Sequence, residues 1–206
     1  MLRMQFFEER LRLPGPAIFF DRDGVINCRR PGDYVLEWSQ FLFIPGIEAA
    51  LQQLATLHLP MIVISNQACV GKGLLDSASL EEITGRMHQN FAAIGVFMAA
   101  AYYCIHRADE NCICRKPKPG LLQYAAGDYN IDLTRSVFIG DSDTDIQAGL
   151  AAGCMPILFG STALENSGDS LSAKCIPVAR TPMELFPICA NFLKDCGSSE
   201  ATTTSV

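Results

Sequence analysis

Residues 17–27 read AIFFDRDGVIN, an apolar run followed at once by two aspartates and a glycine. The run AIFF lacks the apolar–polar alternation of a half-exposed strand and is typical of a strand covered on both faces in a parallel sheet. Asp21 follows that run directly, and Gly24 permits a sharp turn after Asp23. The stretch therefore predicts two carboxylates at the carboxyl end of a buried strand, where open α/β sheets bind their ligands.

Further apolar runs of the same kind follow along the chain, namely MIVIS, AAAYY, SVFIG and PILF. Helical patterns lie between them, at residues 47–57, 78–95, 120–130 and 143–153. For the second of these helices, Ser79 is the predicted N-cap. Strands that alternate with helices at this spacing predict an α/β fold with a doubly wound parallel sheet.

The length and composition suit one domain. A chain of 206 residues with 49% hydrophobic and 18% charged residues can bury one substantial core. We expect an N-terminal extension at residues 1–14, a single catalytic domain at 15–195 and a disordered tail at 196–206. The tail contains SSEATTTSV, which has too little apolar surface to stay ordered.

Charge and hydropathy patterning argue against several classes of partner. The apolar runs fall far short of the roughly 20 residues that span a bilayer, so no membrane association is expected. The first residues, MLRMQFFEERLRLPGP, lack the order of a secretory signal, which favours a cytoplasmic protein. A net charge of −6 argues against nucleic acid as a partner. We expect a monomer whose partner is a small metabolite.

The two aspartates suit phosphoryl-transfer chemistry. One carboxylate can attack phosphorus to form an aspartyl-phosphate, while the other protonates the leaving alcohol and later deprotonates the hydrolytic water. Two anions need a hard cation to approach a phosphate, and Mg²⁺ fits that need. A bare pair of aspartates is more simply explained as a turn that closes a strand, so other motifs must decide.

The pattern of FFDRDGVIN resembles the first motif of the haloacid dehalogenase (HAD) superfamily, and three further stretches follow in that family's order over roughly residues 17–159. The resemblance implies a Rossmann-like fold, with Asp21 as the nucleophile and Asp23 as the acid and base. The fourth motif, in VFIGDSDTD, implies Asp141 as a metal ligand with Asp145 nearby. Asp21, Asp23 and Asp141 are thus the predicted magnesium ligands, although a helix start capped by Asp143 would also explain the fourth stretch.

The second and third motifs supply the remaining phosphate contacts that the resemblance implies. MIVISNQ places Ser65 and Asn66 at a strand end, followed by Gln67, and we expect all three to bind substrate. Lys116, in CRKPKPG, is expected to neutralise the nucleophile and contact the phosphoryl oxygens. Each has a simpler alternative, because Ser and Asn often form turns and a lysine often lies on the surface.

Residues 104–114, CIHRADENCIC, contain four metal-binding side chains spaced C-x-H-x5-C-x-C. The nine cysteines of the chain are an odd number and three of them crowd here, which favours a metal over disulfides. Three thiolates and one imidazole form a closed tetrahedral set suited to structural Zn²⁺, and the alternative is a group of reduced thiols with one incidental histidine. We refer to these four residues as the Cys–His cluster: Cys104, His106, Cys112 and Cys114.

This zinc loop, together with DRDGVIN, SNQ and CRKPKPG, is similar to the group that contains D-glycero-D-manno-heptose 1,7-bisphosphate phosphatases and histidinol-phosphate phosphatases. The resemblance implies a magnesium-dependent phosphoric monoester hydrolase without a large cap domain. PGDYVLEWSQFLFIPG and KPKPGLL favour the heptose branch, so the expected substrate is the C7 phosphate of the heptose bisphosphate, with histidinol phosphate as the alternative. A phosphomutase would need a cap, and a binding module would not need all the motif residues.

Substrate choice must come from the loops around the site. Lys72, in SNQACVGKG, lies where the heptose branch usually carries Arg and is predicted to contact a second phosphate, unless it is a plain surface lysine. Arg115, next to Lys116, is a further predicted substrate contact. Ser142 departs from the family pattern, which often has a basic residue there. Weaker candidates for sugar contacts lie in the loop after the first motif: Arg29, Arg30 and Tyr34.

Overall fold

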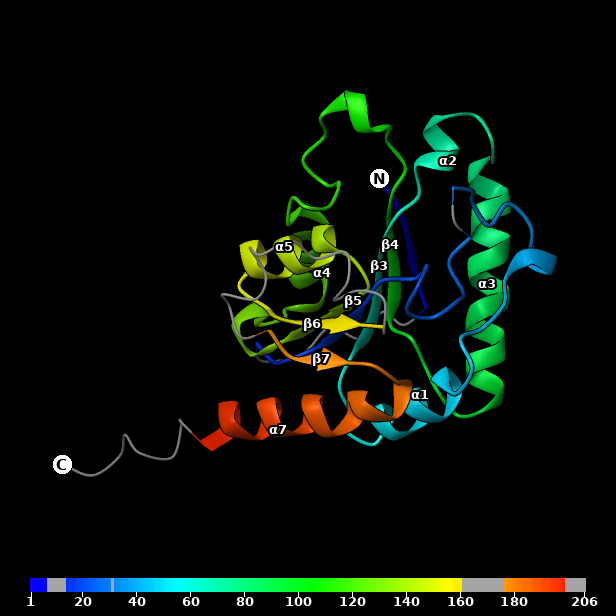
Figure 1. The fold of residues 1–206 in the computed structure, drawn as a ribbon. Helices are drawn as coiled ribbons and strands as arrows, with labels where there is room; N and C mark the ends of the chain where they lie inside the picture. Colours follow the sequence, from blue (N-terminus) through cyan, green and yellow to red (C-terminus); the bar gives the residue numbers. More distant parts are fainter. Residues whose placement is uncertain (7–13, 31, 161–175, 199–206) are drawn as a thin grey trace.

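A mostly parallel β-sheet forms the centre of the molecule in this computed structural model (Figure 1), which describes residues 1–6, 14–30, 32–160 and 176–198. The strands, in chain order, are β1 (Leu2–Gln5), β2 (Ile18–Phe20), β3 (Met61–Asn66), β4 (Ala100–Cys104), β5 (Val137–Gly140), β6 (Met155–Phe159) and β7 (Val178–Ala179). They lie in the order β1-β4-β3-β2-β5-β6-β7, and every neighbouring pair is parallel except β1 and β4. The strand that carries the first motif, β2, is therefore central.

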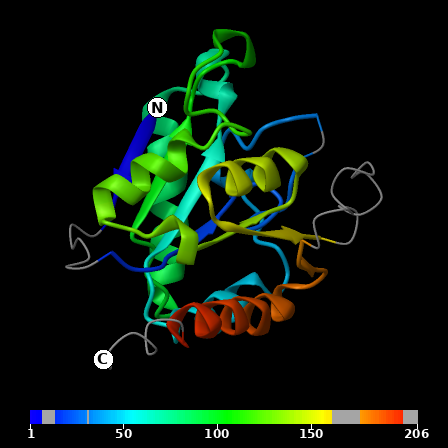
Figure 2. The same ribbon diagram turned by 90° about the vertical axis from the view of Figure 1, so that its left-hand side faces the viewer.

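Helices cover both faces of this sheet. The α-helices are α1 (Ile47–Ala55), α2 (Ala68–Gly71), α3 (Ser77–Ala93), α4 (Gly120–Tyr129), α5 (Asp143–Ala152) and α7 (Leu185–Ser198). Short 3-10 helices are η1 (Trp38–Gln40), η2 (Ala108–Glu110), η3 (Leu133–Arg135) and η5 (Pro182–Glu184). Helices α4 and α5 pack on one face, while α1, α3 and α7 lie on the other (Figures 1 and 2). The predicted doubly wound sheet is confirmed.

The two-sided burial of β2 explains why its sequence shows no alternation. Ile18 and Phe20 belong to the core beneath α1, α3 and α7, whereas Phe19 belongs to the core beneath α4 and α5. All three side chains are fully buried. Each such side chain contributes about 1.5 to 3 kcal/mol by leaving water, so β2 holds the residues that follow it in a fixed position.

Both ends of the chain add to the domain. The segment expected as an N-terminal extension supplies the edge strand β1, in which Leu2 lies opposite Tyr103 of β4. Arg3 of the same strand forms a 2.7 Å ion pair with Asp128. At the other end α7 runs to Ser198, so the first residues of the expected tail are helical, and residues 199–206 lie outside the described residues.

Two helix starts differ from the sequence-based expectations. Helix α3 begins at Ser77, and its N-cap is Asp76, which accepts a 2.6 Å hydrogen bond from the backbone N–H of Ser79. The prediction of Ser79 as N-cap is therefore wrong by one turn. Helix α5 is capped by Ser142, because its side chain and that of Asp145 form a reciprocal capping box.

The connections after β2 and β3 stay short enough to leave the strand ends open. Between β2 and α1 the described residues contain only η1, and between β3 and α3 only the four-residue α2. No separate cap domain is present in these described connections. Within the described ranges no helix is both long enough and apolar enough to cross a bilayer.

Candidate active site

Asp21 and Asp23 lie at the carboxyl end of β2. The backbone N–H of Asp21 donates to the carbonyl of Ile139 in β5 over 2.8 Å, which continues the strand pairing up to the aspartate. Gly24 follows with φ +98°, and a Cβ built there would lie 1.9 Å from Oδ2 of Asp141. Glycine is thus required both for the turn and for the approach of the carboxylate from β5.

Lys116 joins two carboxylates inside the molecule. Its ammonium lies 2.8 Å from Oδ1 of Asp21 and 2.5 Å from Oδ1 of Asp145, and it also donates to the carbonyl of Ile64 over 3.2 Å. Its side chain is only 3% exposed. Burial lowers the pKa of Lys116, but the charges of Asp145 and Asp21 outweigh burial and raise that pKa above its ordinary value. Lys116 therefore remains charged.

The structure gathers Asp21, Asp141 and Asp145 into a set that we call the carboxylate centre. One oxygen from each lies within 4.8 Å of the others. Burial, opposed by Lys116 and reinforced by Asp145, raises the pKa of Asp21. Burial and the charge of Asp21 raise the pKa of Asp141 to about 7, although Arg29, which donates to Asp141 over 2.9 Å, opposes the shift. The three carboxylates repel one another, and the single charge of Lys116 does not balance them. A divalent cation bound here would relieve this repulsion.

The donor set of the carboxylate centre fits Mg²⁺, which prefers hard oxygen ligands. Asp21 and Asp141 were the predicted ligands, and Asp145 joins them. The Asp23 carboxylate lies outside this set and is bound instead by Arg22, Asn27 and Gln67. Its role as a magnesium ligand stays a prediction.

The surroundings of Asp23 favour the ionised form of its carboxyl group. Burial raises the pKa of Asp23, but the charge of Arg22 and hydrogen bonds from Asn27 and Gln67 lower it to below the ordinary value. The Asp23 side chain remains 26% exposed, whereas that of Arg22 is 1% exposed. Sequence reasoning missed Arg22, and the one available signal was an arginine placed between the two aspartates.

Ser65, Asn66 and Gln67 follow at the end of β3. The Ser65 hydroxyl is buried and accepts a 3.2 Å hydrogen bond from Nε2 of Gln67. The Asn66 side chain makes two hydrogen bonds of 3.1 Å, both to the backbone of Lys116. Asn66 thereby connects β3 to the segment that delivers the ammonium to Asp21.

A pocket of about 380 Å³ opens beside the carboxylate centre, and we call it the loop pocket. Its lining includes Asp23 and Asn66, together with three cationic side chains, an aspartate that pairs with one of them and a tyrosine: Arg29, Arg30, Lys72, Asp33 and Tyr34. Lys72 bridges the pocket by donating to the Tyr34 hydroxyl over 2.9 Å. Arg115, the remaining predicted contact, is half-buried and does not line this pocket.

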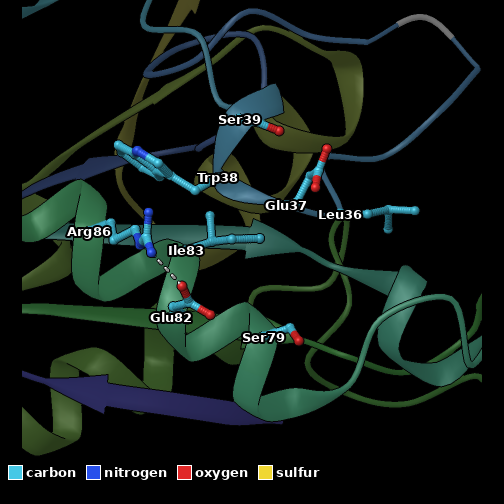
Figure 3. A pocket seen from close by; sticks show the side chains of 8 residues that line it. All are labelled: Leu36, Glu37, Trp38, Ser39, Ser79, Glu82, Ile83 and Arg86. Atoms are coloured by element: carbon cyan, nitrogen blue, oxygen red, sulfur yellow. Dashed lines mark ion pairs between the residues drawn. The ribbon is translucent and has the colours of Figure 1, made fainter.

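A second groove, of about 330 Å³, lies between η1 and α3. Figure 3 shows Arg86 facing Glu82 across one turn of α3, and the two form a 2.8 Å ion pair. Trp38 and Glu37 lie on the opposite wall. None of the motif residues lines this groove, so the loop pocket is the candidate substrate site.

The Cys–His cluster forms one compact group. The sulfur of Cys104 lies 3.6 Å from Nδ1 of His106 and 3.5 Å from the sulfur of Cys112. The sulfur of Cys114 lies 3.2 Å from His106 and 3.6 Å from Cys112. Zinc bonds of about 2.0 to 2.3 Å in a tetrahedron place ligand atoms roughly 3.5 to 3.8 Å apart. Three of the four distances match this range and the distance between Cys114 and His106 is shorter, so the donors are close to the arrangement that the ion needs. Burial raises the pKa of Cys114 to about 12, and a bound cation would favour its thiolate.

Comparisons with known proteins agree with the motifs. A family model described as "HAD-hyrolase-like" matches residues 113–171. The D-glycero-beta-D-manno-heptose-1,7-bisphosphate 7-phosphatase of Helicobacter pylori (strain J99) is 38% identical over 66% of this chain and 78% of that protein. The protein of the same name from Yersinia pestis is 34% identical over 77% and 85%.

A solved structure is also similar over most of the chain. The D,D-heptose 1.7-bisphosphate phosphatase of B. bronchiseptica, crystallised with magnesium and phosphate, superposes with a TM-score of 0.75 at 29% identity. The match covers 87% of this chain and 99% of that chain. A HAD-like phosphatase from Mesorhizobium loti, with a TM-score of 0.78 and 24% identity, is similar in fold.

Proposed function

The chain belongs to the family of D-glycero-beta-D-manno-heptose-1,7-bisphosphate 7-phosphatases, and from this premise we propose that it is a magnesium-dependent HAD phosphatase that removes the C7 phosphate of D-glycero-D-manno-heptose 1,7-bisphosphate. One observation carries the proposal most strongly. A buried lysine pairs with Asp21 and Asp145, and Asn66, which hydrogen-bonds the backbone of that lysine, lines a pocket with three cationic side chains. That arrangement suits a substrate with one phosphate at each end.

Asp21 is the nucleophile in this proposal. Its carboxylate attacks phosphorus, and the phosphoryl group transfers to it as the sugar oxygen leaves. Lys116 holds Asp21 in place and balances the negative charge that gathers on the phosphoryl oxygens. Ser65, at the neighbouring strand end, is the donor proposed to orient the phosphate. Magnesium, held by Asp21 and Asp141 with Asp145 alongside, would neutralise the phosphate so that an anionic nucleophile can approach it.

Asp23 is the proposed acid and base. It lies two residues beyond the nucleophile and lines the loop pocket, where we propose that the sugar and its leaving oxygen bind. In the first step the protonated form of Asp23 gives its proton to that oxygen, and in the second the resulting carboxylate takes a proton from the water that attacks the aspartyl-phosphate. The two halves of the reaction thus return Asp23 to its starting state.

The loop pocket supports a bisphosphate over histidinol phosphate. Among the described residues Lys72 pairs with a tyrosine hydroxyl rather than a carboxylate, which leaves its charge available to an anion. Arg29 and Arg30 line the same pocket, where they pair with Asp141 and Asp33 respectively. The positive charge of Lys72 attracts a second phosphate and repels the protonated amine of histidinol phosphate.

The Cys–His cluster is proposed as a structural zinc site. Its donors are all protein side chains, which leaves no open position for a substrate. Lys116 follows Cys114 by two residues, so a bound ion would also fix the segment that carries the ammonium to Asp21. We further propose that the enzyme acts as a monomer in the cytoplasm, because charged sugar phosphates are consumed in the compartment where they are made.

Phosphate release with the metal-loaded protein tests the assignment. Both anomers of the heptose bisphosphate, the heptose 7-phosphate and histidinol phosphate are compared at equal Mg²⁺, with phosphorus NMR to identify the phosphate removed. We expect the highest kcat/KM on a bisphosphate anomer and loss of the C7 phosphate. Faster turnover of histidinol phosphate would reject the substrate assignment, and no turnover of any ester would reject the activity.

The same assay tests the loop pocket. Lys72→Ala should raise KM for the bisphosphate about 10-fold and leave the monophosphate nearly unchanged, since a charge-assisted contact is lost only where a second phosphate exists. Arg86→Ala, in the groove of Figure 3, is the matched control because it removes a cation that pairs with Glu82 away from the site. Equal effects of the two substitutions would contradict the role of Lys72.

A further inference from the structure

Arg22 is a charged side chain enclosed in the core. Its side chain is 1% exposed, and its guanidinium carbon lies 5.9 Å from the ring centres of both Phe41 and Tyr103. Burying an arginine costs several kcal/mol unless a counter-ion and hydrogen bonds compensate. An apolar side chain would fill the same space at less cost, so the charge calls for a function.

The guanidinium of Arg22 donates hydrogen bonds to the side chains of Asp23 and Gln67. Nη2 lies 3.0 Å from each oxygen of Asp23, Nε lies 3.3 Å from Oδ1, and Nη2 also donates to Oε1 of Gln67 over 3.1 Å. Gln67 in turn donates to Oδ2 of Asp23 over 2.6 Å. Arg22, Gln67 and Asp23 therefore form a closed triangle of hydrogen bonds.

The triangle determines how the Asp23 carboxylate is held. Asn27 donates to Oδ1 over 2.9 Å, so donors from three residues hold the two oxygens. These bonds fix both the rotamer and the plane of the carboxylate. Gln67 is itself anchored on Ser65, which lies beside the proposed phosphate position. A proton transfer needs such control, because it is efficient only when donor and acceptor are aligned within hydrogen-bond reach.

We propose that Arg22 and Gln67 are positioning residues for the proton transfer that Asp23 performs, a role that rests on the proposed phosphatase function. Arg22 is too deeply buried to touch the substrate, so it acts through Asp23. As the bond between phosphorus and the sugar oxygen breaks and the bond to Asp21 forms, the proton moves from Asp23 to the leaving oxygen. Arg22 stabilises the carboxylate that this transfer leaves behind, and the attacking water then returns a proton to it.

The proposal predicts a dependence on the leaving group. A sugar alkoxide is a poor leaving group and needs the proton from Asp23, whereas p-nitrophenolate leaves readily without one. Loss of the positioning residues should therefore slow the hydrolysis of sugar phosphates far more than the hydrolysis of p-nitrophenyl phosphate. Damage to phosphate binding or to the fold would slow both kinds of ester alike.

Steady-state kinetics of Arg22→Gln on the two kinds of ester provide the test. We expect kcat on the sugar phosphate to fall about 100-fold, within the usual range for general acid catalysis, and kcat on the aryl ester to fall only a few-fold. Asp23→Asn should give the same pattern with larger losses. Arg22→Lys should restore part of the sugar phosphate activity, because it keeps the charge but lacks the planar fork.

A second substitution covers the case in which Arg22→Gln does not fold. Gln67→Met removes one bond to Asp23 without leaving a buried charge unpaired, and we expect its loss on the sugar phosphate to exceed its loss on the aryl ester about 10-fold. Thr84→Val is the control, since it breaks the buried 2.9 Å bond between Thr84 and Tyr103 and should affect both esters equally.

The outcomes separate this inference from the proposed function. If the unsubstituted protein hydrolyses sugar phosphates and the losses in Arg22→Gln or Gln67→Met are equal for the two esters, the positioning role is rejected while the phosphatase stands. If the unsubstituted protein hydrolyses neither ester, the proposed function itself fails. Losses that follow the leaving group, together with recovery in Arg22→Lys, support the role.

Discussion

The carboxylate centre and the Cys–His cluster both gather metal-binding side chains, but different parts of the fold hold them. Asp21 follows the central strand β2, Asp141 and Asp145 follow its neighbour β5, and the Lys116 ammonium is tied to the carbonyl of Ile64 in β3. Buried strands on both sides fix these positions. The carboxylate centre is therefore a product of the packed core.

The Cys–His cluster lies on a loop with little core of its own. Of its four members only Cys104 belongs to a strand, and the other three lie between β4 and α4. Most residues of this loop are exposed, including Ile113 at 67%. Few apolar contacts organise this loop, so we expect a bound ion to do so. The comparison teaches that the carboxylate centre depends on the packed fold. The loop around the Cys–His cluster is instead expected to depend on the metal bound there.

The two regions meet at Lys116. Its backbone follows Cys114 by two residues, and its ammonium lies between the carboxylates of Asp21 and Asp145. The side chain of Asn66 forms two hydrogen bonds with the backbone of Lys116. Substitutions on either side of this junction should separate effects on chemistry from effects on local folding.

The largest effect is expected from Asp21→Asn. Because the amide cannot act as a nucleophile, activity should fall by on the order of 10⁴-fold or more. The fold should persist, since Asn has nearly the same shape and Lys116 keeps its pair with Asp145. Phosphate release and thermal unfolding measure the two effects. A variant that unfolds would contradict the view that the core alone builds the carboxylate centre.

Lys116→Met should damage both chemistry and stability. It leaves buried carboxylates without their cation, so we expect a loss of about 3 to 5 kcal/mol in unfolding free energy and an activity loss of about 1000-fold. Denaturant unfolding without added metal gives the first value. Lys118→Met is the control from the same segment, because Lys118 is exposed and contacts no carboxylate among the described residues. Its ammonium donates to the carbonyl and the side-chain oxygen of Asn111 and to the carbonyl of Cys112. Similar losses for the two lysines would mean that the ion pairs matter little.

Cys112→Ser should separate the two regions most directly. We expect loss of bound zinc, faster hydrogen exchange in residues 105–118 with unchanged protection of β2, β3 and β5, and roughly 10- to 100-fold lower activity. Cys28→Ser is the control, because it changes a half-buried cysteine outside the Cys–His cluster. We expect this variant to bind zinc as the unsubstituted protein does. Faster exchange in the central strands would show that the core depends on the loop after all.

The smallest effect is a pH response outside both regions. His88 on α3 stacks on Phe6 with ring centres 4.0 Å apart, and burial lowers the pKa of His88 below 6.5. Its neutral form favours the folded state, so the contribution is present above pH 6.5 and is lost as the pH falls through 6.5 toward the folded pKa. Thermal unfolding at pH 7.5 and 5.5 should show a smaller acid-induced decrease in His88→Gln. An identical decrease would place the acid sensitivity elsewhere, such as in the carboxylate centre.

The sequence predicted most of what depends on local pattern. The uninterrupted apolar run before Asp21 indicated a strand buried on both faces, and the spacing of the Cys–His cluster indicated a group that the structure brings within 4.8 Å. Both features lie within short stretches of chain. By contrast, the edge strand at Leu2–Gln5 was not predicted, because LRMQ has too few residues to show a period and its pairing depends on β4.

Sequence alone determined which chemical groups follow the strand ends, since hydrophobic periodicity fixes where strands stop and the next residues are read directly. Tertiary structure alone decided how those groups pair. Asp145 pairs with Lys116 across 29 positions of the chain, and Gln67 reaches Asp23 across 44. Arg22 could have faced solvent as easily as the core. Such pairings depend on charges that meet only after the sheet has assembled, and no local pattern in the chain encodes that meeting.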